Sequence, residues 1–371
     1  MERIFEGARH LGKKFIENQI ERGKEAEVLK PKLAWLTVNH RCNLHCEWCY
    51  QKELGGKGKT MPKELAKELV DLLAAFNMDF LVLIGGEPSL WEHFFTLVKY
   101  IREKGMKVTV VSNALAFSNQ KFLEKTVRAG VTNITVSVKG TSSAEYQETA
   151  GNAGGYDVVC RAIRNIQKTP IIQMISVTVS YSTIQNWSAM MEFLKGCGAK
   201  FFSFSFEKPV VLSDGRITFD DRMMPDKVAP FIHEVMYPSL VEAGIDFKME
   251  FIFPHCHYSQ EFIDGVEKAN HAFGGCLLLR SNGVVFDPEG FVLPCNHFIG
   301  YPLGKYGVDF KTPDEFLRWR SEPKISGFYE NTMKSPCGEC TECERWGKCG
   351  SGCRLFWLYR GPKELIKKYS R

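Results

Sequence analysis

Three cysteines lie close together near the start of this 371-residue chain, in the stretch Cys42-Asn-Leu-His-Cys46-Glu-Trp-Cys49. They stand at positions i, i+4 and i+7, so three thiols occur within eight residues. A four-iron cluster that is ligated only by cysteine takes four thiolates. Three thiols without a fourth nearby would leave one iron open to bind a substrate or cofactor, as the open position of a catalytic zinc does. The alternatives are part of a disulfide framework and a zinc site closed by His40 or His45.

Composition narrows the class of protein in which such a site can lie. Hydrophobic residues make up 44% of the chain and charged residues 25%, as in ordinary soluble proteins. The formal net charge of +5 is too small to indicate binding to nucleic acid or to a membrane surface. Apolar runs stay short of the about 18 residues of a membrane-spanning helix, and the charged N-terminus argues against a signal peptide. We therefore expect a cytoplasmic protein, in which thirteen cysteines bind metal rather than form disulfides.

Short apolar runs alternate with helical patterns over the first two thirds of the chain. Helices separate six expected strands, which span 34–38, 80–84, 107–111, 133–138, 171–180 and 200–206. Six β–α units predict a parallel sheet with right-handed crossovers, and six rather than eight predict an α/β fold with an open partial (β/α)6 barrel. Residues 1–33 fit an amphipathic helix that packs on this barrel. Functional residues of such folds lie at the carboxyl ends of the strands.

Polar residues follow the expected strands. The sequence Gly85-Gly86-Glu87-Pro88 comes directly after 80–84. Glycines allow a backbone to approach a ligand closely, and a carboxylate can pair with an ammonium group. The alternative is a simple Gly-Gly turn. Candidates at the ends of other strands, each of which could instead be a strand-end cap, are Asn113, Ser137 and Ser180.

Two charged residues are expected at the mouth of the barrel. Lys139 follows the fourth strand and Glu207 ends the sixth. A lysine at this place could bind a carboxylate or a phosphate, or it could be a solvated surface charge. Both residues are candidates for a catalytic or substrate-binding role.

Most of the remaining thiols follow residue 250. These metal-ligand candidates are Cys256, Cys276, Cys295, Cys337, Cys340, Cys343, Cys349 and Cys353. A zinc ribbon would need only four of them. A hairpin is predicted over 284–295, a helix over 225–243 and a strand over 246–253. Cys160 and Cys197 stand at apolar positions of helical patterns and are interpreted as buried, inert thiols.

The cysteine loop followed by Gly-Gly-Glu-Pro resembles the radical S-adenosylmethionine (radical SAM) superfamily. The C-terminal cysteines resemble the SPASM subfamily, whose members modify peptides and proteins. The resemblance implies a four-iron cluster at Cys42, Cys46 and Cys49, which reduces S-adenosylmethionine and yields a 5′-deoxyadenosyl radical. The residues that it implies for cofactor binding are Trp48, Gly85, Gly86, Glu87, Pro88, Asn113, Ser137 and Ser180. Many peptide-modifying relatives carry aspartate where this chain has Lys139.

The resemblance also implies two auxiliary four-iron clusters and a division of the chain. The barrel spans 34–208, a bridging region 209–270, and a SPASM-type auxiliary-cluster domain 271–371. One cluster takes Cys337, Cys340, Cys343 and Cys349, because the run resembles that of bacterial ferredoxins. The other takes Cys276, Cys295 and Cys353, with Cys256 as the fourth ligand. The rival is an open iron at this second site, with Cys256 free.

Three functions are compatible with these features. The first is radical modification of a ribosomally made peptide or a protein side chain, by crosslinking, epimerisation or oxidation. The second is the same chemistry on a small metabolite such as a sugar or a tetrapyrrole, which Lys139 favours. The third is a non-enzymatic electron carrier, although a carrier needs no open iron. Expected partners are a flavodoxin or ferredoxin-type reductant and a separate leader-peptide-binding protein.

Overall fold

Mostly parallel strands form one curved sheet that runs through most of the chain. The computed structural model describes residues 30–54, 58–273 and 283–361. Within these ranges the sheet has eleven strands in the order β10-β9-β6-β5-β4-β3-β2-β1-β11-β12-β13. The strands are β1 (Leu33–Thr37), β2 (Phe80–Ile84), β3 (Lys107–Ser112), β4 (Asn133–Val138), β5 (Ile172–Val179), β6 (Phe202–Phe206), β9 (Phe247–Glu250), β10 (Ala272–Phe273), β11 (Gly283–Phe286), β12 (Phe291–Leu293) and β13 (Gly304–Lys305). The predicted N-terminal helix, up to residue 29, and Cys276 lie outside the described residues.

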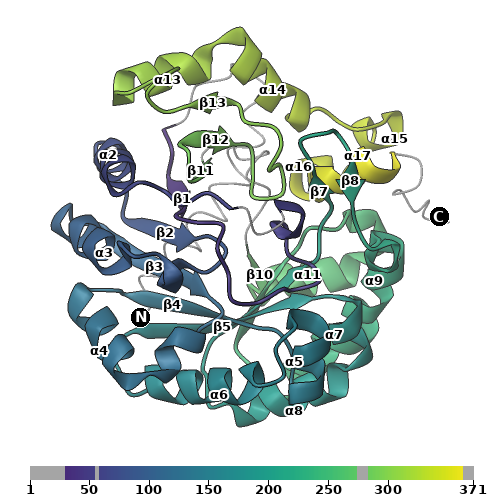
Figure 1. Cartoon of the computed structure of the whole chain (residues 1–371). Helices are drawn as coiled ribbons and strands as arrows, with labels where there is room; N and C mark the ends of the chain where they lie inside the picture. Colours follow the sequence, from purple (N-terminus) through teal and green to yellow (C-terminus); the bar gives the residue numbers. More distant parts are fainter. Residues whose placement is uncertain (1–29, 55–57, 274–282, 362–371) are drawn as a thin grey trace.

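Helices cover the outer face of this sheet (Figure 1). They are α2 (Lys63–Ala74), α3 (Phe94–Glu103), α4 (Gln120–Ala129), α5 (Ser143–Ala150), α6 (Gly155–Ile166), α7 (Tyr181–Gln185), α8 (Trp187–Gly196), α9 (Pro225–Phe231), α10 (Tyr237–Glu242) and α11 (Gln260–Lys268). A π-helical turn, Ile232–Met236, joins α9 to α10. Short 3-10 turns are η1 (Lys52–Leu54), η2 (Pro88–Leu90), η3 (Leu115–Ser118), η4 (Asp221–Met223) and η6 (His255–His257).

The two faces of the sheet have different surroundings. In β5, Ile175 and Val177 are buried against the helices, whereas the alternate residues Ser176 and Thr178 stay half-exposed. Successive side chains of a strand point to opposite faces. The half-exposed set therefore faces the inside of the curved sheet.

The predicted α/β fold with an open partial barrel is confirmed, and the sheet continues beyond the six predicted units. At one end β9 pairs in parallel with β6, and at the other β11 pairs in parallel with β1. β11 and β12 form the predicted hairpin. Because β9 and β11 belong to this sheet, it crosses the boundaries that were predicted near 208 and 270.

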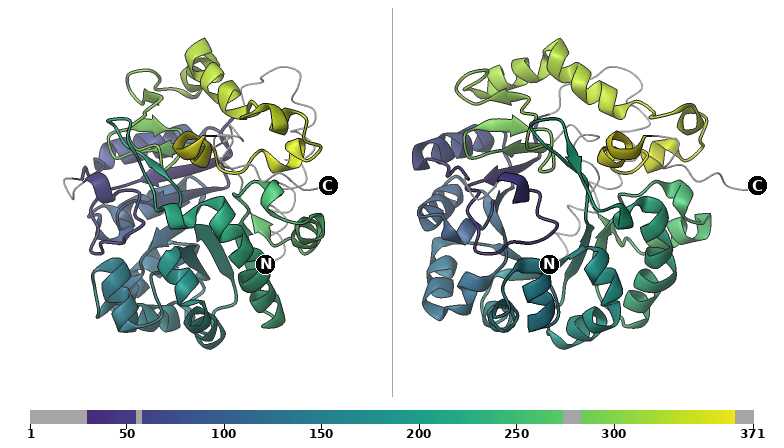
Figure 2. Two further views of the ribbon diagram at one scale, coloured as in Figure 1. Left: turned by 90° about the vertical axis from the view of Figure 1, so that its right-hand side faces the viewer. Right: turned by 45° about the vertical axis from the view of Figure 1, so that its right-hand side comes forward.

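The C-terminal part lies across the opening of the curved sheet (Figure 2). Its helices are α13 (Pro313–Ser321), α14 (Pro323–Met333), α15 (Gly338–Thr341), α16 (Trp346–Cys349) and α17 (Arg354–Arg360). A small hairpin, β7 (Val210–Val211) with β8 (Ile217–Thr218), stands apart from the main sheet. The cysteine-rich run is thus carried by short helical turns.

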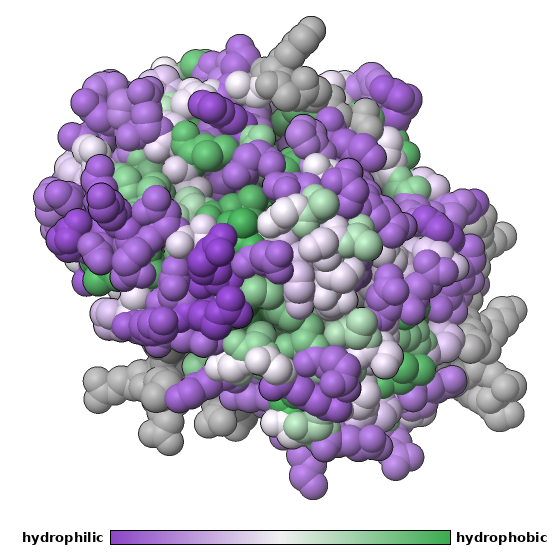
Figure 3. Space-filling model, turned by 60° about the horizontal axis from the view of Figure 1, so that its bottom comes forward, coloured by the Kyte–Doolittle hydropathy of each residue, from purple (hydrophilic) through white to green (hydrophobic). Residues whose placement is uncertain are grey.

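The outer surface is mostly polar on the face shown in Figure 3. Hydrophilic side chains cover most of that face, and hydrophobic ones gather in scattered patches. No helix within the described residues is long and apolar enough to cross a membrane.

Candidate active site

The cysteine loop follows β1 and is fixed by backbone hydrogen bonds to the end of α5. The N–H groups of His45 and Glu47 donate to the carbonyl oxygens of Ala150 and Thr149, at 3.0 and 2.9 Å. In Figure 1 this segment lies over the centre of the curved sheet. Asn113 after β3 lies near Cys42, and Lys139 after β4 lies near Cys49, so the loop lies at the carboxyl ends of these strands.

The three thiols of this loop lie within electrostatic range of one another. Cys46 is buried, and Cys42 and Cys49 are half-buried. Burial, with the neighbouring Glu87 and the other two sulfurs, raises the pKa of Cys42 to about 11. The N–H of Leu44 donates to Cys42 Sγ at 3.4 Å. Such N–H···S bonds are among the groups that tune iron–sulfur clusters.

The donor set of the loop fits a cluster better than a single metal ion. Within the described residues no three His, Cys, Asp or Glu side chains converge closely enough to hold one ion. His40 Nδ1 instead accepts a hydrogen bond from the N–H of Lys59, and His45 is exposed. In a cluster each thiolate binds a different iron, so the sulfurs need not meet at one point.

The Gly-Gly-Glu-Pro segment packs directly on the start of the cysteine loop. The N–H of Gly86 donates to the Asn39 carbonyl at 2.8 Å, and that of Glu87 to the Arg41 carbonyl at 2.8 Å. A Cβ on Gly86 would lie 2.4 Å from the Arg41 oxygen, and one on Gly85 would lie 2.6 Å from the Asn39 oxygen. The glycines are thus required for close approach between two protein segments.

Glu87 joins this segment to the end of β3. Its side chain is 1% exposed. One carboxylate oxygen accepts from Ser112 Oγ at 2.7 Å and from the N–H of Ser89 at 3.1 Å, and the other accepts from the N–H of Asn113 at 2.8 Å. Pro88 then opens η2. The carboxylate positions the end of β3 beside the cysteine loop.

Asn113 contacts the cysteine loop, whereas the side chain of Ser180 makes a capping hydrogen bond at the start of a helix. Asn113 Nδ2 donates to Asn43 Oδ1 at 2.8 Å and lies 3.9 Å from Cys42 Sγ. Ser180 is 1% exposed and caps α7 through a reciprocal capping box with Thr183. Ser180 is thus the N-cap of α7, and its contact with the cofactor stays a prediction.

Lys139 lies beside the cysteine loop. Its Nζ donates to Ser137 Oγ at 2.6 Å and stands 5.7 Å from the centre of the Trp48 ring. It is also within electrostatic range of Cys49. Lys139, Ser137 and Trp48 thus form one group next to the thiols, which places the positive charge close to the expected cofactor.

Glu207 lies at the end of β6 among other charged residues. Burial, followed by repulsion from Asp220 and Glu47, raises the pKa of Glu207 to about 7. Arg222 Nη2 binds Asp220 Oδ2 at 2.7 Å, and its guanidinium stacks on Tyr181. A carboxyl group with a pKa near 7 can both accept and donate a proton near neutral pH.

The raised pKa of Glu207 predicts a pH-dependent stability. The folded state holds the proton more tightly than the unfolded state, so stability is lost as pH rises from about 4.5 through about 7. The substitution Glu207→Gln removes this titration. Its effect on the free energy of unfolding should therefore be more stabilising above pH 8 than at pH 5, by roughly 2 kcal/mol. Urea unfolding at both pH values measures this. Glu192→Gln, on an exposed carboxylate of α8, is the control, and equal pH slopes for wild type and Glu207→Gln would contradict the prediction.

The C-terminal thiols fall into two groups by their neighbours. Cys295 and Cys353 both lie within electrostatic range of Lys208. Burial alone would lower the pKa of Lys208, but Glu250, 2.6 Å away, raises it. In the other group, Cys340 lies within range of Cys337, Cys349 and Cys256.

The sequence analysis missed a ring contact between the two cysteine regions. The rings of Tyr50 and His297 lie 5.4 Å apart. Burial and then the Lys208 ammonium lower the pKa of His297 to about 3, so its ring is neutral. Its Nδ1 is buried and has no hydrogen-bond partner within the described structure. The sequence offered one indication of this contact, since each ring lies next to a cysteine. Tyr50 follows Cys49, and His297 comes two residues after Cys295.

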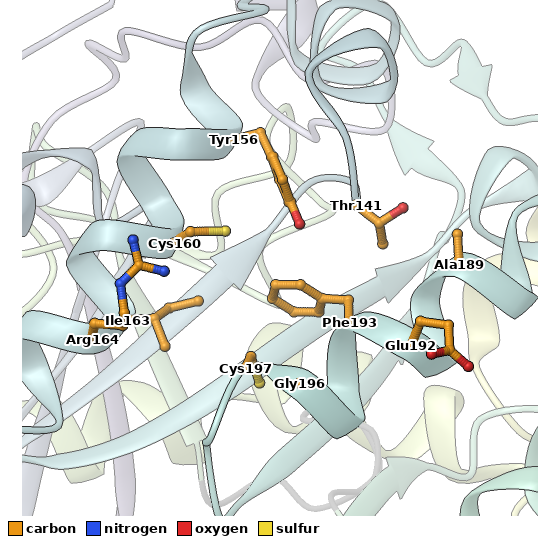
Figure 4. Close-up of a pocket in the computed structure, with 10 residues that line it drawn as sticks. All are labelled: Thr141, Tyr156, Cys160, Ile163, Arg164, Ala189, Glu192, Phe193, Gly196 and Cys197. Carbon is orange, nitrogen blue, oxygen red and sulfur yellow. The ribbon is translucent and has the colours of Figure 1, made fainter.

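The two cysteines assigned to the helices share a cavity on the outside of the barrel (Figure 4). Cys160 of α6 and Cys197 after α8 line a space of about 530 Å³ together with Tyr156, Phe193 and Arg164. Both thiols are half-buried, and burial raises the pKa of each. They remain protonated near neutral pH, as inert thiols do.

Comparison with known proteins identifies the barrel. Residues 36–204 match the family model described as the radical SAM superfamily. AdoMet-dependent heme synthase of Methanosarcina barkeri is 24% identical over 340 residues, which cover 87% of this chain and 91% of that protein. Fe-coproporphyrin III synthase of the same organism is 27% identical over 168 residues, 45% of this chain and 41% of that one. The sporulation killing factor maturation protein SkfB of Bacillus subtilis is 27% identical over 187 residues, 49% and 43% of the two chains.

Two of these three relatives match over less than half of their own length. Among solved structures, Streptococcus suis SuiB bound to the precursor peptide SuiA has a TM-score of 0.69 and 16% identity. That superposition covers 96% of this chain and 78% of SuiB. The fold is therefore shared well beyond the barrel.

Proposed function

Because this chain is a radical SAM enzyme, we propose that it modifies a side chain of a ribosomally made peptide or of a protein, by crosslinking, epimerisation or oxidation. SkfB, which is named a maturation protein, supports this class of substrate. The observation that carries the proposal is the set of carboxylates at the barrel mouth.

These carboxylates oppose a substrate that is itself rich in carboxylates. Glu207 lies within electrostatic range of Asp220 and Glu47, whose repulsion outweighs the attraction of Arg222 and Lys52, and like charges in a partly buried site repel one another. Lys139, the cation that could attract an anionic metabolite, donates to Ser137 and lies beside the cysteine loop, next to the expected cofactor. A peptide with amide groups and basic side chains suits this mouth better than a porphyrin that bears several carboxylates.

Radical chemistry on a tetrapyrrole is the second candidate. It is favoured by the match to AdoMet-dependent heme synthase, which spans 91% of that protein. Both candidate functions would use the cysteine loop. They differ in the residues that would contact the substrate.

The family assignment implies one four-iron cluster and S-adenosylmethionine, which together supply a 5′-deoxyadenosyl radical. Cys42, Cys46 and Cys49 would hold the cluster. Asn113, beside Cys42, and Trp48, beside Lys139, would line the place of S-adenosylmethionine. Glu207 would hold or accept a proton at the substrate end of the barrel.

We also propose two auxiliary four-iron clusters at the C-terminal thiols. A flavodoxin or ferredoxin-type protein would supply electrons, and a separate protein would bind the leader peptide. The proposed location is the cytoplasm, where thiols stay reduced.

The proposal is tested by offering the anaerobically reconstituted enzyme two kinds of substrate. One is a set of synthetic peptides encoded by short reading frames next to the gene, and the other is iron coproporphyrin III. We expect mass spectrometry to find a modified peptide and an unchanged porphyrin. The double variant Glu207→Gln, Asp220→Asn should process the peptide at least about tenfold more slowly, since a lost charge contact is worth about 1.5–3 kcal/mol.

The opposite result would favour the second candidate. Conversion of the porphyrin, with every peptide unchanged, would transfer the enzyme to tetrapyrrole chemistry. S-adenosylmethionine cleavage serves as the control for intact cofactor loading in both arms.

A further inference from the structure

Lys139 holds a half-buried ammonium group beside the cysteine loop. Its Nζ stands 5.7 Å from the centre of the Trp48 ring, and Cys49, the next residue along the loop, lies within its electrostatic range. Nζ donates a hydrogen bond to Ser137 Oγ at 2.6 Å. Within residues 30–54, 58–273 and 283–361, no carboxylate forms an ion pair with it. Its positive charge can therefore act on a negative group at the loop.

Two residues of α5 fix the backbone of Lys139 against this loop. Thr149 Oγ1 donates to the Lys139 carbonyl at 2.6 Å, and the Thr149 carbonyl accepts from the N–H of Glu47 at 2.9 Å. The N–H of Lys139 donates to Tyr146 Oη at 3.4 Å, and the Tyr146 phenol lies within electrostatic range of Cys46. The position of the ammonium group is therefore set by the fold before any ligand binds.

Two charged side chains of opposite sign act on the thiols of the loop. Burial raises the pKa of both Cys42 and Cys49. Glu87 adds to this rise at Cys42, and Lys139 opposes it at Cys49. A negative charge that develops at the loop is thus disfavoured by Glu87 and favoured by Lys139.

Reduction of an iron–sulfur cluster develops such a charge. A cluster held by three thiolates gains one negative charge with each electron that enters it. A nearby cation stabilises the reduced form more than the oxidised form, and this attraction is stronger in a partly buried site than in water. Net charge and hydrogen bonds are among the features that set the reduction potential of such a cluster.

We propose that Lys139 makes the cluster expected at Cys42, Cys46 and Cys49 easier to reduce, by holding a fixed positive charge beside it. Lys139 is a positioning residue in this role: the electron comes from the external reductant, and the ammonium group keeps its proton. The inference goes beyond the proposed function and holds for a peptide and for a porphyrin alike. It gives Lys139 a role at the loop instead of the substrate-binding role that its place at the barrel mouth suggested.

The test is a redox titration of the full-length, anaerobically reconstituted protein, followed by electron paramagnetic resonance. S-adenosylmethionine is left out, so that a change in cofactor binding cannot cause a shift. Subtracting the spectrum of the protein with alanine at Cys42, Cys46 and Cys49 isolates the cluster of the loop. In Lys139→Met the ratio of reduced to oxidised cluster at a fixed potential should fall about tenfold, which is a midpoint more negative by about 59 mV for one electron.

Three further variants separate charge from packing. Lys139→Gln should shift the midpoint as Lys139→Met does, because both remove the charge. Lys139→Arg keeps the charge and should keep the wild-type midpoint. Lys195→Met removes the same charge from the exposed face of α8, where Lys195 pairs with Glu192, and should also leave the midpoint unchanged. A midpoint does not depend on the amount of cluster, so a variant that loads less iron can still be measured.

Equal midpoints for the wild type and the two neutral variants would overturn the proposal. A shift of the same size in Lys139→Arg would also overturn it, because packing rather than charge would then be responsible. Slower substrate modification by Lys139→Met at an unshifted midpoint would assign the residue to substrate binding. The titration contains no substrate, so its outcome is independent of whether the enzyme modifies a peptide.

Discussion

A chain with alanine at Cys42, Cys46 and Cys49 is expected to release no 5′-deoxyadenosine from S-adenosylmethionine under a strong reductant, whereas the wild-type chain releases it. Three thiols converge on the loop that follows β1, and thiolates are the ligands of iron–sulfur clusters. Without them the first electron has no path to S-adenosylmethionine. The loss should be complete, and liquid chromatography of the quenched reaction measures it.

The matched control removes two other thiols. The double variant Cys160→Ala, Cys197→Ala changes half-buried cysteines in the outer cavity and should cleave S-adenosylmethionine at the wild-type rate. Circular dichroism checks that both proteins are folded. Cleavage by the triple variant at the wild-type rate would refute the role of the loop.

The substitution Gly86→Ala is expected to have the second largest effect. Its Cβ would lie 2.4 Å from the Arg41 oxygen and 2.5 Å from the His40 oxygen, and these are backbone atoms. Relief requires the cysteine loop to move, which breaks the 2.8 Å bond from the Gly86 N–H to the Asn39 carbonyl. We expect a loss of about 1–3 kcal/mol in the free energy of unfolding and of most of the iron at the loop.

Gly265→Ala is the control for this variant. Gly265 lies in α11, and a Cβ there would meet nothing within 4 Å, so the change should be neutral or slightly stabilising. Chemical denaturation and iron analysis of both variants make the comparison. A Gly86→Ala protein with wild-type stability and iron content would show that the two segments do not need their close contact.

The sequence predicted the elements well and their long-range contacts poorly. The strand over 80–84 is correct to the residue, because a run of apolar residues between polar segments suits a strand buried on both faces. The hairpin over 284–295 was also found from its turn. Its parallel pairing with β1 was not, because local patterns carry no information about which distant strand a segment joins.

In the candidate site, too, the residues could be predicted from the sequence but their long-range partners could not. The glycines at 85 and 86 were expected to let the backbone approach a ligand, and within the described structure they let it approach the backbone at Asn39 and Arg41. Ser180 carries the same side chain whether it caps a helix or contacts a ligand, and only the position of Thr183 decides. The docking of η6 on the C-terminal run joins residues 94 apart, His255 and Cys349, and no local pattern in the sequence indicates it.

The place of β1 between β2 and β11 has a consequence for how the protein is made. Until residues 283–286 have left the ribosome, one side of β1 has no parallel partner, and its N–H and carbonyl groups form an open edge. The nascent chain would therefore hold the thiols of residues 42–49 beside an unfinished sheet during most of its synthesis. Iron insertion during translation would meet an incomplete pocket, so the physiological order should be synthesis first and cluster loading afterwards.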